Sequence, residues 1–170
     1  MVNTMNETNL NRKIQDSEDR VAIREIIDNY SIWADMKEPR KQAELFSETG
    51  IIESYLKDPE TGELKLISKL TGRKEIGDGF ENFLKNFQTV YHFNGQNTVT
   101  LQGKKADGIS YCMVTLINVE TGKKVKTSYG IHYHDEYVRE NNQWLFAKRT
   151  TVFDWQDKEE LDHSLSKQDV

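Results

Sequence analysis

The sequence has little of what disulfide, zinc or nucleic-acid chemistry requires. Cys112 is the one cysteine in 170 residues, which excludes an internal disulfide and a multi-cysteine zinc site and favours the cytosol. Lys and Arg number 23 against 28 Asp and Glu, so the net charge is −5. Because neutralising phosphates needs clustered Lys and Arg, and no basic block occurs, we expect no nucleic-acid partner.

Membrane and nucleotide signals are also missing. No apolar run approaches the roughly 20 residues that a membrane span needs, and the first 15 residues lack the apolar segment of a secretory signal. We therefore expect a cytoplasmic protein without a membrane partner. The chain contains no Gly-x-Gly-x-x-Gly, P-loop or Gly-x-Ser-x-Gly motif, which excludes the usual nucleotide sites and the hydrolase nucleophile elbow.

The residues that are present suit one soluble domain with an aromatic core. Apolar residues make up 36% of the chain and charged residues 30%, and 7 Phe, 7 Tyr and 3 Trp can fill an interior. Composition predicts a polar extension over 1–16, a domain over 17–155 and an acidic tail over 156–170.

Apolar periodicity predicts helices in the first half of the chain. Steps of three and four residues from Val21 to Ala34 indicate a helix that starts at Ser17. Pro39 opens a second, short helix that ends near Gly50. Strands over 51–56 and 64–70 flank a turn, and a third helix fits 73–87.

The second half has the pattern of an antiparallel meander. Runs over 91–102, 109–119, 124–139 and 143–154 are separated by hairpin signals. Alternation over 124–139 places Tyr133 and Asp135 on one face, and His132 and His134 on the other. Helices followed by sequential strands predict an α+β fold, in which a twisted sheet with helices on its concave side forms a cone around a small-molecule pocket.

A carboxylate, a histidine and a tyrosine are the candidate reactive groups. His92 lies among aromatic residues at the start of a strand, where it is either a structural residue or a base. Asp35 follows an apolar helical stripe and either caps the helix end or borders the cavity together with Tyr30. Around an apolar pocket, such a set suits proton transfer next to a carbonyl without metal or cofactor.

A metal site is the other reading of the histidines. His132 and His134 lie two residues apart on one strand face, so they could ligate zinc with a carboxylate. They share that face with Lys126 and Glu136, which favours solvent or a subunit interface. We therefore predict no metal.

Several short segments, in this order and spacing, resemble the SnoaL-like branch of the NTF2-like superfamily, which includes scytalone dehydratase and bile-acid 7α-dehydratase. They are Asp19-Arg20-Val21-Ala22-Ile23-Arg24-Glu25-Ile26-Ile27-Asp28-Asn29-Tyr30, Ala34-Asp35, Ala43-Glu44-Leu45-Phe46, Thr71-Gly72-Arg73-Lys74-Glu75-Ile76, His92-Phe93-Asn94-Gly95, Tyr133-His134-Asp135-Glu136-Tyr137-Val138-Arg139 and Gln143-Trp144. The resemblance implies a cone-shaped α+β barrel with three N-terminal helices against a curved, mostly antiparallel sheet. It also implies a homodimer or homotrimer.

The resemblance implies roles for particular residues. His92 and Asp35 match the family's catalytic dyad, and Tyr30 and Tyr55 fall near its tyrosines. For substrate binding we assign Trp33, Tyr111 and Tyr133. The chain has Tyr111-Cys112 where scytalone dehydratase has a second histidine, and Arg149 lies near an arginine of the bile-acid enzyme, on a side of its strand that can face outward.

These residues predict a cofactor-free dehydratase, another lyase, or an isomerase. Its substrate would be a small apolar molecule that carries a hydroxyl or carbonyl group. The alternative is a non-catalytic protein of the same fold, which binds a small molecule or serves as an oligomeric interaction subunit.

Overall fold

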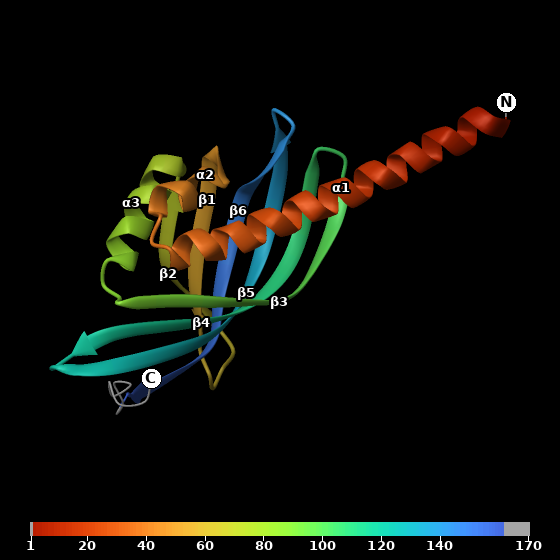
Figure 1. The fold of residues 1–170 in the computed structure, drawn as a ribbon. Coiled ribbons are helices and arrows are strands. Elements are labelled where there is room, and N and C mark those ends of the chain that lie inside the picture. The colour runs from red at the N-terminus through yellow and green to blue at the C-terminus, as the bar shows by residue number, and fades with distance from the viewer. Residues whose placement is uncertain (1, 162–170) are drawn as a thin grey trace, which may run out of the picture.

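The computed structural model describes the backbone of residues 2–161 and the side chains from residue 7 onward. Six strands form one sheet in the order β2-β1-β6-β5-β4-β3, in which β1 and β6 run parallel and all other neighbours antiparallel. The elements are α1 (Val2–Asp35), α2 (Pro39–Glu44), β1 (Phe46–Lys57), β2 (Leu64–Thr71), α3 (Arg73–Leu84), β3 (Thr89–Gln102), β4 (Lys105–Glu120), β5 (Lys123–Glu140) and β6 (Gln143–Glu160) (Figure 1). The predicted α+β class with a mostly antiparallel sheet is confirmed.

The first helix is longer than predicted. It runs without interruption from Val2 to Asp35 and projects beyond the sheet at its N-terminal end (Figure 1). Ser17 does not begin it, because its hydroxyl donates to the carbonyl of Lys13 one turn back, at 2.9 Å. No proline or glycine precedes Pro39, so nothing in the backbone interrupts the helix. Among the described residues, no helix has the length and apolar composition that a membrane crossing requires.

Other element boundaries also differ from the prediction. The second helix ends at Glu44, and β1 begins at Phe46, well before Gly50. The last strand continues to Glu160, paired with β5, so the first residues of the predicted acidic tail belong to the sheet. Residues 162–170 of that tail lie outside the described residues.

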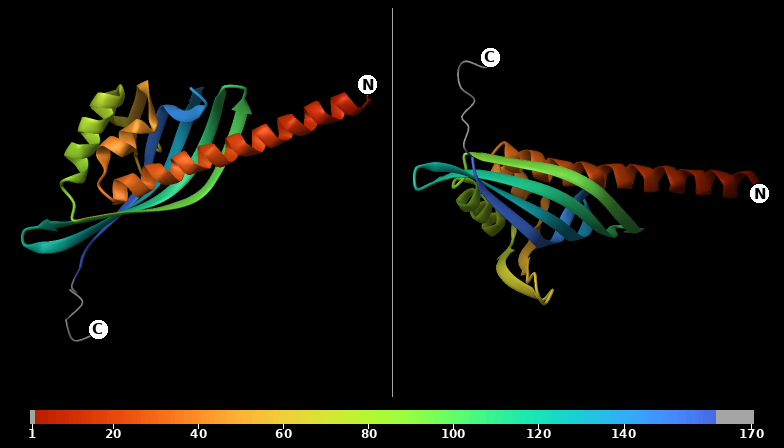
Figure 2. Two further views of the ribbon diagram at one scale, coloured as in Figure 1. Left: turned by 45° about the horizontal axis from the view of Figure 1, so that its top comes forward. Right: turned by 90° about the horizontal axis from the view of Figure 1, so that it is seen from below.

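The helices lie together on one side of the curved sheet (Figures 1 and 2). Buried Asp19 of α1 accepts hydrogen bonds from the Trp144 indole and from Arg139, both at 3.0 Å. Beneath the helices, the ring of Tyr30 packs edge-on against Phe80 and Phe146, with centroids 5.8 and 5.9 Å apart. These contacts bury apolar surface at one end of the cone and fix α1 across the strands.

Candidate active site

A cavity of about 460 Å³ lies between the helices and the inner face of the sheet. This volume is in the range of small-molecule sites. The lining is mostly apolar and aromatic, with a few hydroxyl, amide and imidazole groups, and none of the described residues that form it is Asp, Glu, Lys or Arg. It consists of Tyr30, Ala34, Gln42, Ile52, Ser54, Leu56, Ile67, Ser68, Leu70, Gly79, Phe80, Phe83, Leu84, His92, Val114, Leu116, Tyr129, Ile131, Tyr133, Thr151, Phe153 and Gln156.

His92 of the lining is bonded twice to Asp35. Its ring Nδ1 lies 2.6 Å from Oδ1 of the carboxylate, and its backbone N–H donates to Oδ2 at 3.0 Å. The His92 side chain is 9% exposed and that of Asp35 25%. Two contacts to one residue fix both the position and the orientation of the carboxylate.

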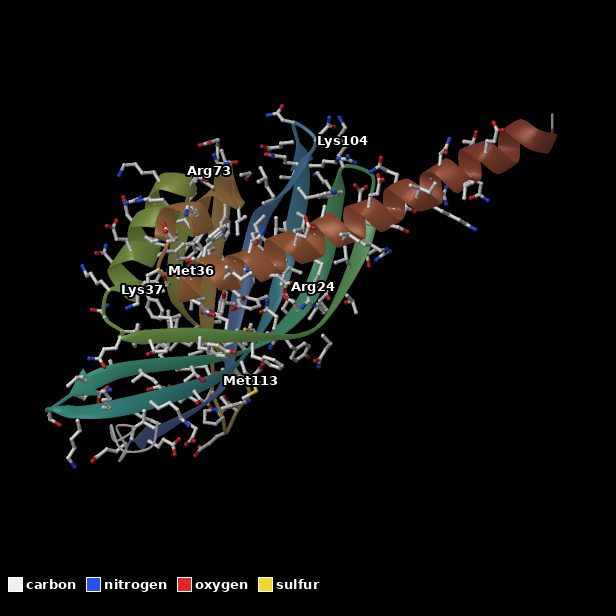
Figure 3. All side chains as sticks on the ribbon, in the orientation of Figure 1. Arg24, Met36, Lys37, Arg73, Lys104 and Met113 are labelled. Carbon is white, nitrogen blue, oxygen red and sulfur yellow. The ribbon has the colours of Figure 1, made fainter. Side chains whose placement is uncertain are left out.

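The end of α1 explains why Asp35 can make these contacts. The helix stops there because Lys37 adopts a positive φ of 55° and Pro39 opens the next helix. Figure 3 marks Met36 and Lys37 at this end of α1. A carboxylate at a helix C-terminus faces the negative end of the helix dipole, and the hydrogen bonds from His92 compensate for that.

The Asp35 contact also defines the tautomer of His92. An ionised carboxylate only accepts hydrogen bonds, so the neutral ring carries its hydrogen on Nδ1. Nε2 then keeps its lone pair and can take a proton from a molecule in the cavity. Asp35 therefore both orients the imidazole and stabilises the charge that it acquires.

Asn94 joins β3 to α1 next to the His92–Asp35 pair, because it lies on β3 two residues beyond His92 and bonds to side chains of α1. Its Oδ1 accepts a hydrogen bond from Ser31 at 2.9 Å, and its amide donates to Asp28 at 3.0 Å. The two contacts fix β3 against the last three turns of α1, which sets the approach of His92 to Asp35.

Two tyrosines belong to the lining of the same cavity. Tyr30 and Tyr133 both line it, and both are buried. Burial raises the pKa of Tyr30 to about 12, and it raises the pKa of Tyr133 well above its ordinary value. Both hydroxyls are therefore neutral across the physiological pH range and can donate hydrogen bonds.

Arg149 faces inward, behind these tyrosines. Its guanidinium lies 4.2 Å from the ring centroid of Tyr30 and 4.0 Å from that of Tyr133. It forms two hydrogen bonds of 2.8 Å to Asp135, which also accepts one from Tyr137. Burial disfavours the charge of Arg149, but Asp135 outweighs burial, so the pKa of Arg149 is raised. The outward orientation that the sequence allowed is thus wrong.

Three predicted site residues lie outside the cavity. Tyr55 alternates with Ser54 and Leu56, which face inward. Tyr111 is 46% exposed on the outer face of β4, next to buried Cys112, whose pKa is raised to about 11 by burial. Trp33 lies one residue off the helical stripe of the cavity and has the Lys41 ammonium 4.9 Å above its ring. The strand pleat and the helical twist explain these corrections.

Tyr55 instead belongs to a polar cluster on the outer face. Its hydroxyl donates to Glu53 at 3.2 Å, and Lys69 and Lys148 each lie 2.9 Å from that carboxylate. The hydrogen bonds from Lys69 and then Lys148 lower the pKa of Glu53 to about 2. A carboxyl with a lowered folded-state pKa contributes stability above its ordinary pKa and loses it as the pH falls toward the folded value.

We expect Glu53→Gln to lower the free energy of unfolding by about 1 kcal/mol near neutral pH, a modest effect because solvent screens the two lysines. The difference from wild type should shrink below about pH 4.5 and vanish only well below pH 2, where Glu53 is protonated in both the folded and the unfolded state. Denaturant unfolding over a pH series measures this. Glu63→Gln, at an exposed turn position, is the matched control, and an equal effect of both variants would contradict the assignment.

His132 and His134 lie on the outer face of the sheet. The His132 ring bonds to Asp154 and lies 5.8 Å from the Tyr111 ring and 5.1 Å from the His134 ring. Among the described residues, no cluster of three or more His, Cys, Asp or Glu side chains could hold a metal ion. The described part of the chain thus contains two His–Asp pairs, one at the cavity wall and one on the outer face of the sheet.

Sequence reasoning missed Gln42, Ser54 and Thr151 of the lining. Gln42 had no visible signal, because a six-residue helix shows no clear periodicity. For Thr151, alternation with Phe153 and Arg149 along β6 was a usable signal. For Ser54, the signal was its alternation with Ile52.

Three helices that close a curved sheet over an apolar cavity define the class of cone-shaped α+β proteins. The chain belongs to the family of the SnoaL-like domain, within the NTF2-like superfamily, and the family model matches residues 15–150. A sequence search among curated proteins finds no match.

Solved structures with this fold include proteins of different function. A candidate scytalone dehydratase from Novosphingobium aromaticivorans has a TM-score of 0.72 and 20% identity, over 89% of this chain and 95% of that one. The hexachlorocyclohexane dehydrochlorinase LinA-type3 from Novosphingobium barchaimii has a TM-score of 0.69 and 16% identity, over 89% of this chain and 96% of that one. The beta subunit of a candidate aromatic-ring-hydroxylating dioxygenase from N. aromaticivorans has a TM-score of 0.66 and 14% identity, over 82% of this chain and 91% of that one. At these sequence identities, the similarity shows that this chain shares its fold with the three proteins.

Proposed function

We propose that the protein is a lyase or isomerase that moves a proton next to a carbonyl group of a small, neutral, mostly apolar molecule. The observation that carries the proposal is the 2.6 Å contact between His92 and Asp35 at the wall of a cavity whose lining has no permanently charged side chain. The fold's occurrence among dehydratase-type and dehydrochlorinase-type proteins supports it.

The proposed chemistry needs only the side chains of the site. Nε2 of His92 takes a proton from the carbon beside the carbonyl, and Asp35 stabilises the imidazolium. A hydroxyl of Tyr30 or Tyr133 donates to the oxygen that gains negative charge. In a dehydration, the electron pair of the broken C–H bond forms a C=C bond, the C–O bond to the β-hydroxyl breaks, and the hydroxyl leaves as water with the proton from His92. In an isomerisation, the proton returns to another carbon.

Proton exchange at carbon tests this proposal without knowledge of the substrate. We expect the protein to exchange hydrogen for deuterium beside the carbonyl of neutral bicyclic and polycyclic ketones in D2O, faster than buffer alone, as measured by NMR. A panel that binds without accelerated exchange would contradict it.

The second candidate is a non-catalytic subunit. It is favoured by the likeness to the beta subunit of a candidate dioxygenase. Under this function the protein forms a stable complex with another chain, and exchange at carbon stays at the buffer rate. A homodimer or homotrimer that catalyses exchange would contradict this second candidate. A homodimer or homotrimer stays our prediction for the oligomeric state.

A further inference from the structure

Gln42 carries a buried side-chain oxygen that has no hydrogen-bond partner among the described residues. The residue lies on α2 and is 3% exposed. Its Oε1 is buried without a hydrogen bond, and no hydrogen bond of the described part of the chain involves its Nε2. Since a buried amide without partners is costly to folding, its presence points to a partner outside the chain.

The position of Gln42 says where that partner lies. Gln42 is part of the cavity lining, on a different element from His92. The other buried side-chain atoms without a partner in the described chain, Ser110 Oγ and Arg139 Nε, belong to residues outside the lining. Gln42, which carries the unpaired oxygen, therefore belongs to the lining of the candidate active site.

We propose that Gln42 binds a hydroxyl group of the ligand, separate from the group that reacts at His92, and so selects neutral hydroxylated molecules. A hydroxyl both donates and accepts, and a primary amide offers both complementary groups. A carboxylate could use only the N–H arm and would find no cationic side chain in the lining. The proposal names the substrate class of the proposed function and rests on that function only for the role of His92.

Ligand binding to wild type and Gln42→Leu tests the proposal, with tetralone and its monohydroxylated isomers as probes in calorimetry. We expect wild type to bind one hydroxylated isomer about tenfold more tightly than tetralone, equal to about 1.4 kcal/mol, and Gln42→Leu to lose this preference. Gln143→Leu, which changes an exposed amide outside the lining, should keep it. Gln42→Leu should also melt at the same or a higher temperature, because leucine leaves no amide unpaired.

Each other outcome overturns the proposal. A wild type that binds no probe, or that prefers no hydroxylated isomer, contradicts the ligand class. A preference that survives Gln42→Leu contradicts the residue, and a large loss of stability in that variant shows an internal structural role instead. His92→Gln should keep the hydroxyl preference. If the wild type prefers a hydroxylated probe but does not accelerate proton exchange, only the proposed catalysis is contradicted. If it accelerates exchange but shows no such preference, only the proposed role of Gln42 is contradicted.

Discussion

Replacement of His92 by glutamine is expected to lower the rate of deuterium exchange at carbon by a factor of about 10² to 10⁴, the usual contribution of a general base. Glutamine has no group that accepts a proton near neutral pH, yet its backbone N–H can still donate to Asp35 as that of His92 does. The loss should therefore appear in the exchange rate and much less in the binding of a ketone probe or in the melting temperature.

Asp35→Asn separates orientation from basicity. The asparagine amide can donate to Nδ1, which favours the tautomer with hydrogen on Nε2, where it blocks proton abstraction. We expect most of the exchange rate to be lost, although the imidazole itself is retained.

The second His–Asp pair supplies the matched control. His132 bonds to Asp154 on the outer face of the sheet, so His132→Gln should leave the exchange rate unchanged. Equal losses in His92→Gln and His132→Gln would show that the cavity is not where exchange occurs. An unchanged rate in His92→Gln would remove this residue as the base.

The sequence predicted the fold well because alternation and turn chemistry are local signals. The β5 pattern put Tyr133 and Asp135 on the face that is in fact buried. The resemblance named Asp35 and His92 together, and their side chains lie in hydrogen-bond contact although 57 residues separate them. Their catalytic role stays a prediction. Local signals could not establish the N-terminal start of α1, since the polar residues before Ser17 carry no apolar stripe and only tertiary placement distinguishes a projecting helix from a loop.

Failures at the site have a common cause. Neighbouring side chains point to opposite faces of a strand, and they differ by about 100° around a helix. An error of one residue in the assignment therefore moves a side chain out of the cavity, as happened for Tyr55, Tyr111 and Trp33. The inward orientation of Arg149 was missed for another reason, because arginine is rarely buried unless it is paired. The signal was Asp135, a carboxylate on an otherwise apolar strand face and the direct cross-strand neighbour of Arg149.

Replacement of Arg149 by methionine is expected to lower the free energy of unfolding by about 3 to 5 kcal/mol, because it leaves the Asp135 carboxylate buried without its cation. Arg149 and Asp135 are both fully or almost fully buried, at 0% and 2% exposure, so water cannot replace the lost partner. Denaturant unfolding near pH 7 measures the loss.

A double variant distinguishes the unpaired charge from lost packing. Arg149→Met combined with Asp135→Leu removes both charges, and we expect it to be more stable than Arg149→Met alone. If the single and double variants are equally unstable, then Arg149 stabilises the cone through its stacking between Tyr30 and Tyr133, and its charge contributes little.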